Sequence, residues 1–157
     1  MKLSKLLLSF IAGISFVGGV NAADITIFYA PTCPHCHHAR DFISNNLIYE
    51  YDNLKVKEVN VTNADNRQAF VDALFKCGYQ KGGVPVLVIG EKCFQGYADS
   101  MQQNLRDAIE ADLTQEQKNA AVANKAALES NRDAFVASHS DRKNAISEKD
   151  NQKKNNQ

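Results

Sequence analysis

The stretch FYAPTCPHC, residues 28–36, decides the fold of this 157-residue chain. Residues 24–30 (DITIFYA) are rich in β-branched and aromatic side chains and stop at Pro31, which is typical of a short buried strand. In residues 34–47, apolar side chains recur every three or four positions, as they do on one face of a helix. The Cys-Pro-His-Cys motif, residues 33–36, is therefore predicted to lie where a strand passes directly into a helix.

The rest of the core continues this alternation of strands and helices. Hydrophobic spacing predicts a strand at residues 55–61, a helix at 63–77, strands at 84–89 and 92–95 joined by a tight turn, and a helix at 100–113. Asp99 is expected to cap the last helix, and Tyr97 is expected to pack beneath it. The order β-α-β-α-β-β-α predicts an α/β fold, a four-stranded mixed sheet with helices on both faces, in residues 23–113.

Pro85 interrupts the apolar run VPVLVI, residues 84–89. A proline cannot donate to the hydrogen-bond ladder of a sheet, so it fits at the first residue of a strand. Because cis peptide bonds occur almost only before proline and form tight turns, a cis Val84-Pro85 bond is predicted.

The Cys-Pro-His-Cys motif has the residue types that a reactive disulfide needs. Its spacing allows Cys33 and Cys36 to close a disulfide across one helical turn, and Pro34 fits an early helical position where its missing N–H costs nothing. At the start of a helix, Cys33 would lie beside unpaired amides and the positive end of the helix dipole, which stabilise a thiolate. A protonated His35 would add positive charge and make the disulfide a stronger oxidant. We therefore predict that Cys33 is the reactive thiol and Cys36 the resolving thiol.

Cys77 and Cys93 complete an even count of four cysteines. A second, structural disulfide between them is the favoured interpretation for an oxidising compartment. The alternatives are two separate buried thiols, or a second redox pair that passes electrons to the first.

Charge and composition exclude several classes of protein. The length allows about one compact domain. Eighteen Lys and Arg balance eighteen Asp and Glu, so no basic excess exists to bind nucleic acid or an anionic membrane. His35, His37 and His38 lie beside two cysteines, but no metal site is predicted, because His37 and His38 are adjacent on a helix and diverge by about 100°. No cofactor is predicted.

The two ends of the chain differ from the core. Residues 1–22 combine lysines, an apolar run too short to span a bilayer and a small-x-small pattern, which predicts a secretory signal peptide; an uncleaved anchor is the alternative. We therefore expect the protein in the periplasm. In residues 114–146, apolar positions spaced by seven predict a helical tail that docks on the domain or joins two copies into a homodimer. Residues 147–157, rich in Lys, Asn and Gln, are predicted to be disordered.

FYAPTCPHC, followed by GGVPVLVIG and then FQGY, resembles the thioredoxin superfamily over about residues 24–113. The CPHC motif and the valine before the proline are similar to the DsbA family of periplasmic disulfide oxidases, and TCPHCHHARDF with FQGY is similar to the catalytic domain of DsbC-type isomerases. The compact order of elements is similar to glutaredoxins. The resemblance implies a thioredoxin-like fold in which Cys33 exchanges disulfides, Cys36 resolves them, and Val84-Pro85 lies beside Cys33 to pair with a substrate strand.

Two positions depart from these families. Thioredoxin and DsbA have a buried acid six residues before the reactive cysteine, where this chain has Ile27. Residues 30–32 (Ala-Pro-Thr) replace the lysine with which glutaredoxins hold glutathione. The resemblance therefore does not imply glutathione as a substrate.

We therefore predict a periplasmic thiol:disulfide oxidoreductase, with oxidation of substrate dithiols as the favoured direction. Its expected partners are cysteine-containing exported proteins and a membrane or periplasmic redox protein that recycles the site. Alternatives are an isomerase or reductase dimerised by the tail, and an inert secreted binding module in which Cys33 and Cys36 form a staple. A further alternative is a c-type haem protein, because Cys33-x-x-Cys36-His37 fits the attachment pattern and Met101 is available as a second ligand.

Overall fold

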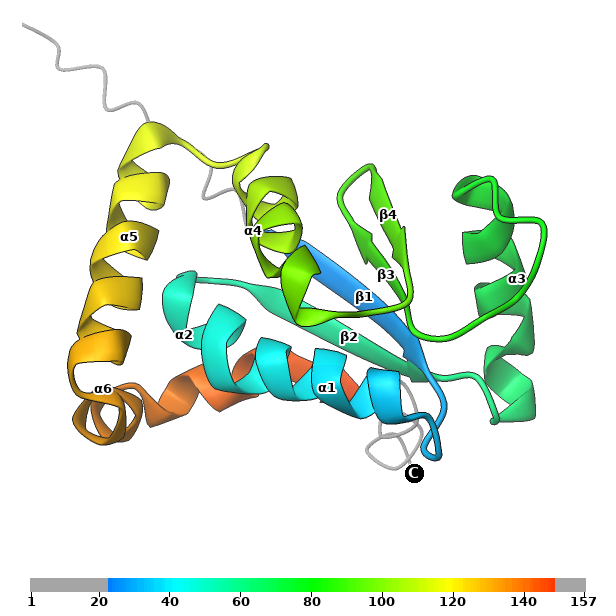
Figure 1. Ribbon diagram of the computed structural model, residues 1–157, viewed down its shortest axis with the longest axis horizontal. Coiled ribbons are helices and arrows are strands. Elements are labelled where there is room, and N and C mark those ends of the chain that lie inside the picture. Colours follow the sequence, from blue (N-terminus) through cyan, green and yellow to red (C-terminus); the bar gives the residue numbers. More distant parts are fainter. Residues whose placement is uncertain (1–22, 149–157) are drawn as a thin grey trace, which may run out of the picture.

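The computed structural model describes residues 23–148, in which one mixed sheet has the strand order β4-β3-β1-β2-β5 (Figure 1). The strands are β1 (Asp24–Tyr29), β2 (Lys55–Asn60), β3 (Val86–Ile89), β4 (Lys92–Gln95) and β5 (Ile146–Glu148). β1 pairs in parallel with β2 and antiparallel with β3, and β3 and β4 form a hairpin. The predicted thioredoxin-like α/β fold is therefore confirmed. The predicted signal peptide, residues 1–22, lies outside the described residues.

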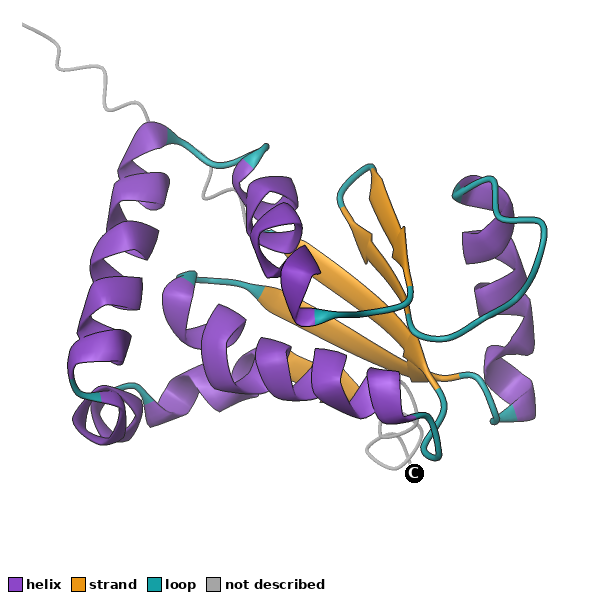
Figure 2. Ribbon diagram, viewed as in Figure 1, coloured by secondary structure: helices purple, strands orange, loops and turns teal. Residues whose placement is uncertain are grey.

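Helices cover both faces of the sheet (Figure 2). They are α1 (Pro34–Phe42), α2 (Ile48–Glu50), α3 (Arg67–Lys76), α4 (Gln102–Glu110), α5 (Gln115–Ser130) and α6 (Arg132–Ser138). α3 packs on one face with Phe28 and Val86, and the other helices build the larger core on the opposite face with Ile25 and Ile27. Alternating side chains of β1 thus serve both layers. Within residues 23–148, no helix has the length and hydropathy that crossing a bilayer requires.

The first helix extends further than predicted. A π-helical turn, Ile43–Leu47, joins α1 to α2, so helical structure continues three residues beyond the expected end at Leu47. Ile48 and Tyr49 are buried in the larger core, which explains why the helix is retained to that point.

The tail corrects two predictions, because the sheet has five strands rather than four. β5 pairs in parallel with β2, so the tail is not helical through residue 146, and Ser147 and Glu148 are ordered in a strand rather than disordered. Pairing of Ile146 with Val56 supplies backbone hydrogen bonds that composition does not reveal. Residues 149–157 lie outside the described part of the chain.

The helices of the tail dock on the domain. Thr114 begins α5 with a capping box, in which its hydroxyl accepts a bond from the Gln117 amide at 3.2 Å. Ala121 and Leu128 are buried, and Phe135 packs against the same core. The apolar side chains spaced by seven therefore pack against the core of their own chain.

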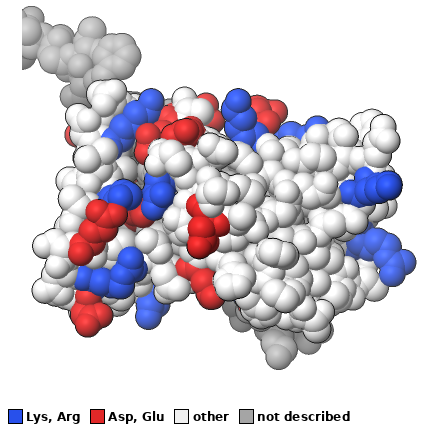
Figure 3. All heavy atoms as spheres, viewed as in Figure 1, with Lys and Arg blue, Asp and Glu red and all other residues white. Residues whose placement is uncertain are grey.

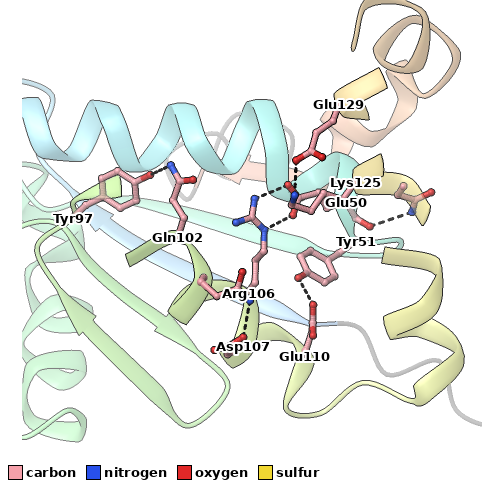
Figure 4. A network of polar contacts seen from close by, with 11 residues as sticks. Glu50, Tyr51, Tyr97, Gln102, Arg106, Asp107, Glu110, Lys125 and Glu129 are labelled. Atoms are coloured by element: carbon pink, nitrogen blue, oxygen red, sulfur yellow. Dashed lines mark hydrogen bonds and ion pairs between the residues drawn. The ribbon is translucent and has the colours of Figure 1, made fainter. Parts of the chain in front are cut away.

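A network of polar contacts joins three helices of this layer (Figure 4). Arg106 of α4 donates two hydrogen bonds to the buried carboxylate of Glu50 of α2, at 2.7 and 2.8 Å. Hydrogen bonding to Glu50 raises the pKa of the Arg106 guanidinium. Asn124 of α5 donates to the Glu50 carbonyl at 3.1 Å. The Tyr51 hydroxyl donates to Glu110 at 2.7 Å. Buried charge is thus paired, as a stable core requires.

The expected helix cap at Asp99 is wrong. Asp99 begins a 3-10 turn (Asp99–Met101) before α4, and its carboxylate accepts a bond from the Gln102 side chain at 3.4 Å instead of capping the backbone. Tyr97 is buried beside Phe42, with ring centroids 6.1 Å apart, as the sequence predicts.

Candidate active site

Cys33 and Cys36 form a disulfide at the junction of β1 and α1. Cys33 is the N-cap residue of α1, and its sulfur accepts a hydrogen bond from the Cys36 amide at 3.1 Å. Cys33 is half-buried, whereas Cys36 is only 1% exposed. Cys33 is therefore the more accessible of the two cysteines.

The local sequence explains why a helix begins at this cysteine. The Cys33 amide donates to the Ala30 carbonyl at 3.1 Å, which closes a turn after β1, and Pro34 is the first helical residue. The first turn of α1 has no acidic residue. A thiolate on Cys33 would therefore lie at the positive end of the helix dipole and would accept a hydrogen bond from the Cys36 amide. No carboxylate of that turn would oppose its negative charge.

Val84 approaches Cys33 from a distant part of the sequence. The Val84-Pro85 peptide bond is cis, and the Val84 carbonyl oxygen lies 3.6 Å from the Cys33 sulfur. In the disulfide this sulfur carries no hydrogen, so the approach is a contact; the reduced thiol has a hydrogen to donate to the same oxygen. The structure thus brings together Cys33, Cys36, Val84 and Pro85.

The histidines of α1 are all exposed. His35 and His38 line a small cavity of about 210 Å³ with Tyr97 and Asp99. His37 instead lies 2.7 Å from the Pro31 carbonyl through Nε2, so it supports the turn before Cys33.

An ion pair behind the motif was missed by sequence reasoning. Arg40 of α1 donates to the buried carboxylate of Glu58 at 2.6 Å and lies 3.7 Å from Glu148. Its guanidinium stacks 4.2 Å from the Tyr29 ring centroid, and the bond to Glu58 raises the Arg40 pKa. The available signal was the position of Glu58, which shares the inward face of its strand with Val56.

A second disulfide joins Cys77, at the end of α3, to Cys93 of β4, with Cα atoms 5.8 Å apart. The alternative of two separate buried thiols is therefore wrong in this structure. A structural disulfide and a second redox pair both agree with the bond. The bond links α3 to the edge of the sheet.

The haem alternative does not agree with the fold. A strand feeds directly into the motif, both cysteines are joined to each other, and His37 is directed to the Pro31 carbonyl. In the part of the chain that the structure describes, no group of three or more His, Cys, Asp or Glu residues is placed to hold a metal.

The face of the molecule that Figure 3 shows carries its charge unevenly. In Figure 3, charged side chains gather over α4, α5 and α6, whereas the surface around the N-terminal end of α1 is largely uncharged. Steering of a strongly charged ligand to Cys33 is not favoured by this surface.

Comparison with known proteins agrees with the geometry. The glutaredoxin family model matches residues 25–94, which include both cysteines of the motif and Val84-Pro85. Among solved structures, a glutaredoxin from Archaeoglobus fulgidus aligns with 20% identity and a TM-score of 0.42, covering 55% of this chain and 86% of that protein. No curated protein matches the chain. Residues 25–94 thus match the glutaredoxin model on a thioredoxin-like fold, and Cys33 and Cys36 form the Cys-x-x-Cys motif of a thiol–disulfide oxidoreductase.

Proposed function

We propose that the protein is a periplasmic dithiol oxidase that transfers the Cys33–Cys36 disulfide to cysteine-containing exported proteins. The observation that carries the proposal is the N-cap position of Cys33, whose sulfur accepts the Cys36 amide bond. The same interactions stabilise a thiolate more than a disulfide, so they favour the reduced protein and make its disulfide oxidising.

The reaction needs only two exchange steps. A substrate thiolate attacks the Cys33 sulfur, the S–S bond breaks, and Cys36 leaves as a thiolate. A second substrate thiolate then attacks the substrate sulfur of the mixed disulfide, and Cys33 leaves as the stabilised thiolate. The substrate gains one disulfide and the protein becomes a dithiol, which an oxidising membrane or periplasmic partner must return to the disulfide.

Two further features support this direction. His35 is exposed in the first turn of α1, two residues from Cys33 in the sequence, where a positive charge on its ring would favour a Cys33 thiolate. On the face shown in Figure 3, the largely uncharged surface around the N-terminal end of α1 suits unfolded polypeptides of any net charge. Isomerase or reductase dimers built by the tail are less favoured, because Ala121 and Leu128 are buried in the chain's own core.

The equilibrium of Cys33–Cys36 with a glutathione redox buffer tests the direction of exchange. A potential near that of DsbA, about −120 mV, supports the oxidase, and one near that of thioredoxin, about −270 mV, contradicts it in favour of a reductase. Cys33→Ser is expected to abolish oxidation of a reduced dithiol peptide with unchanged folding. Retained oxidation would overturn the exchange mechanism.

The role of His35 has a matched control on the same helix. His35→Ala is expected to make the disulfide less oxidising, shifting the equilibrium constant with glutathione by about threefold to tenfold. His38→Ala, about one helical turn after His35, is expected to shift it less. Equal shifts in both variants would show that the position of His35 has no special effect.

A further inference from the structure

The segment that presents Val84 to Cys33 has little regular structure of its own. Residues 78–85 connect α3 to β3 without a helix or strand, and most of them are exposed. Gly82 and Gly83 come directly before Val84, and glycine is the residue with the greatest backbone freedom. The 3.6 Å approach of the Val84 carbonyl to Cys33 therefore depends on what holds this segment.

Gln95, the last residue of β4, holds the segment immediately before Val84. Its side-chain amide donates to the Lys81 carbonyl at 3.0 Å and to the Gly83 carbonyl at 3.4 Å. The amide packs directly on Gly83, since a Cβ atom there would lie 3.4 Å from Gln95 Nε2. Because both partners are acceptors, only the NH₂ side of the amide satisfies them.

The backbone beside Gln95 holds the segment on the other side of Val84. The Gly96 amide donates to the Pro85 carbonyl at 2.8 Å. Further back, the disulfide from Cys93 of β4 fixes Cys77, the residue immediately before the segment. β4 and the residue that follows it therefore hold both ends of the segment, and Gln95 bonds to the backbone immediately before Val84.

We propose that Gln95 is a positioning residue for disulfide exchange with protein substrates, because its amide fixes the Gly83-Val84 backbone beside Cys33. This inference rests on the exchange function proposed above. Gln95 is itself exposed at the end of an edge strand, so it contributes little to the core. Loss of the Gln95 amide should weaken the binding of a substrate polypeptide beside Cys33. The rate of the thiol–disulfide exchange step itself should not change.

The test separates substrate binding from the exchange step. The oxidised protein is mixed with a reduced, unstructured peptide containing two cysteines, and the half-saturating peptide concentration and limiting rate constant are measured by stopped flow. Gln95→Ala and Gln95→Glu should each raise the half-saturating concentration about threefold to tenfold, because each removes the donor to two carbonyl groups. The limiting rate constant, the rate of reduction by dithiothreitol and the equilibrium with glutathione should stay within about twofold.

Gln103→Ala is the matched control. The Gln103 amide donates to Asp107 on the exposed side of α4, so its removal should change none of these quantities. A half-saturating concentration unchanged in both Gln95 variants, or an equal loss in the reaction with dithiothreitol, overturns the positioning role. A wild-type protein that does not oxidise the peptide overturns the proposed function, and this inference with it.

Discussion

Glu58 of β2 is the register partner of Ile27 of β1, and its carboxylate bonds to Arg40 on the helix that carries the redox motif. Thioredoxin and DsbA have a buried acid at the position of Ile27. In this protein the buried acid is placed one strand away, and Arg40 lies one helical turn after Cys36. The acid is 4% exposed and therefore needs its partner.

Glu58→Gln is expected to lower the free energy of unfolding by about 1–2 kcal/mol, measured by urea denaturation. The cost is limited because Arg40 is about one quarter exposed and retains some hydration. Glu148→Gln should cost less than about 0.5 kcal/mol, since that carboxylate is more exposed and 3.7 Å from the guanidinium. Equal costs in the two variants would contradict the assignment of Glu58 as the principal partner.

Cys36→Ser is expected to accumulate a mixed disulfide with a peptide that carries a disulfide. The Cys33 thiolate attacks one peptide sulfur and releases the other as a thiolate, and the Cys36 thiolate that would resolve the complex is gone. Non-reducing electrophoresis and intact mass measure the adduct. Cys33→Ser should form little adduct through the buried Cys36. The opposite distribution between the two variants would reverse the assigned roles of the two sulfurs.

Replacing both Cys77 and Cys93 by alanine is expected to lower the free energy of unfolding by up to about 3 kcal/mol, because the unfolded chain loses a loop closure of 16 residues. Denaturation of the oxidised proteins measures the difference. The equilibrium of Cys33–Cys36 with glutathione should not change. A large change there would instead identify the second pair as part of the electron path.

Tyr51 predicts a loss of stability at alkaline pH. Burial, followed by the hydrogen bond to Glu110, raises the pKa of its hydroxyl above the usual value near 10. The unfolded chain therefore ionises Tyr51 first, so its stabilising contribution is complete below about pH 10 and falls as the pH rises toward the folded pKa.

The stability difference between wild type and Tyr51→Phe isolates this effect. It should decline by up to about 1.4 kcal/mol per pH unit above pH 10, as measured by denaturation from pH 8 to 11. A difference that does not change over this range would show that the Tyr51 hydroxyl titrates alike in both states.

Leu128→Ala is expected to lower the free energy of unfolding by about 2–4 kcal/mol, because this side chain of α5 is 1% exposed in the larger core. Val122→Ala on the same helix is the control, since Val122 is 68% exposed and should cost less than about 0.5 kcal/mol. Similar values for both residues would show that α5 does not pack as described.

Local patterns were sufficient for most of the fold. The position of the motif between β1 and α1 follows from an apolar run that stops at Pro31 and from helical spacing after Pro34. The element order to Leu113 follows in the same way, from the strand and helix periods and from the tight turn between β3 and β4.

The missed features depend on contacts between distant segments. β5 has only one apolar residue, Ile146, and becomes a strand because the edge of β2 offers it hydrogen bonds. The sequence places Glu58 on the same strand face as Val56, but its ion pair with Arg40 exists only because α1 packs on β2. Gln95 likewise has no motif, and its contact with Gly83 exists only because the hairpin folds against the segment before Pro85.

The pairing of β5 with β2 also shields the protein from unwanted association. Without the tail, the outer side of β2 would present unpaired donors and acceptors, the kind of template on which sheets of neighbouring molecules polymerise. A shortened chain ending at Leu113 would keep the whole redox motif but lose this cover. Such a fragment is expected to aggregate during refolding through the exposed edge of β2. The tail therefore protects the domain against aggregation.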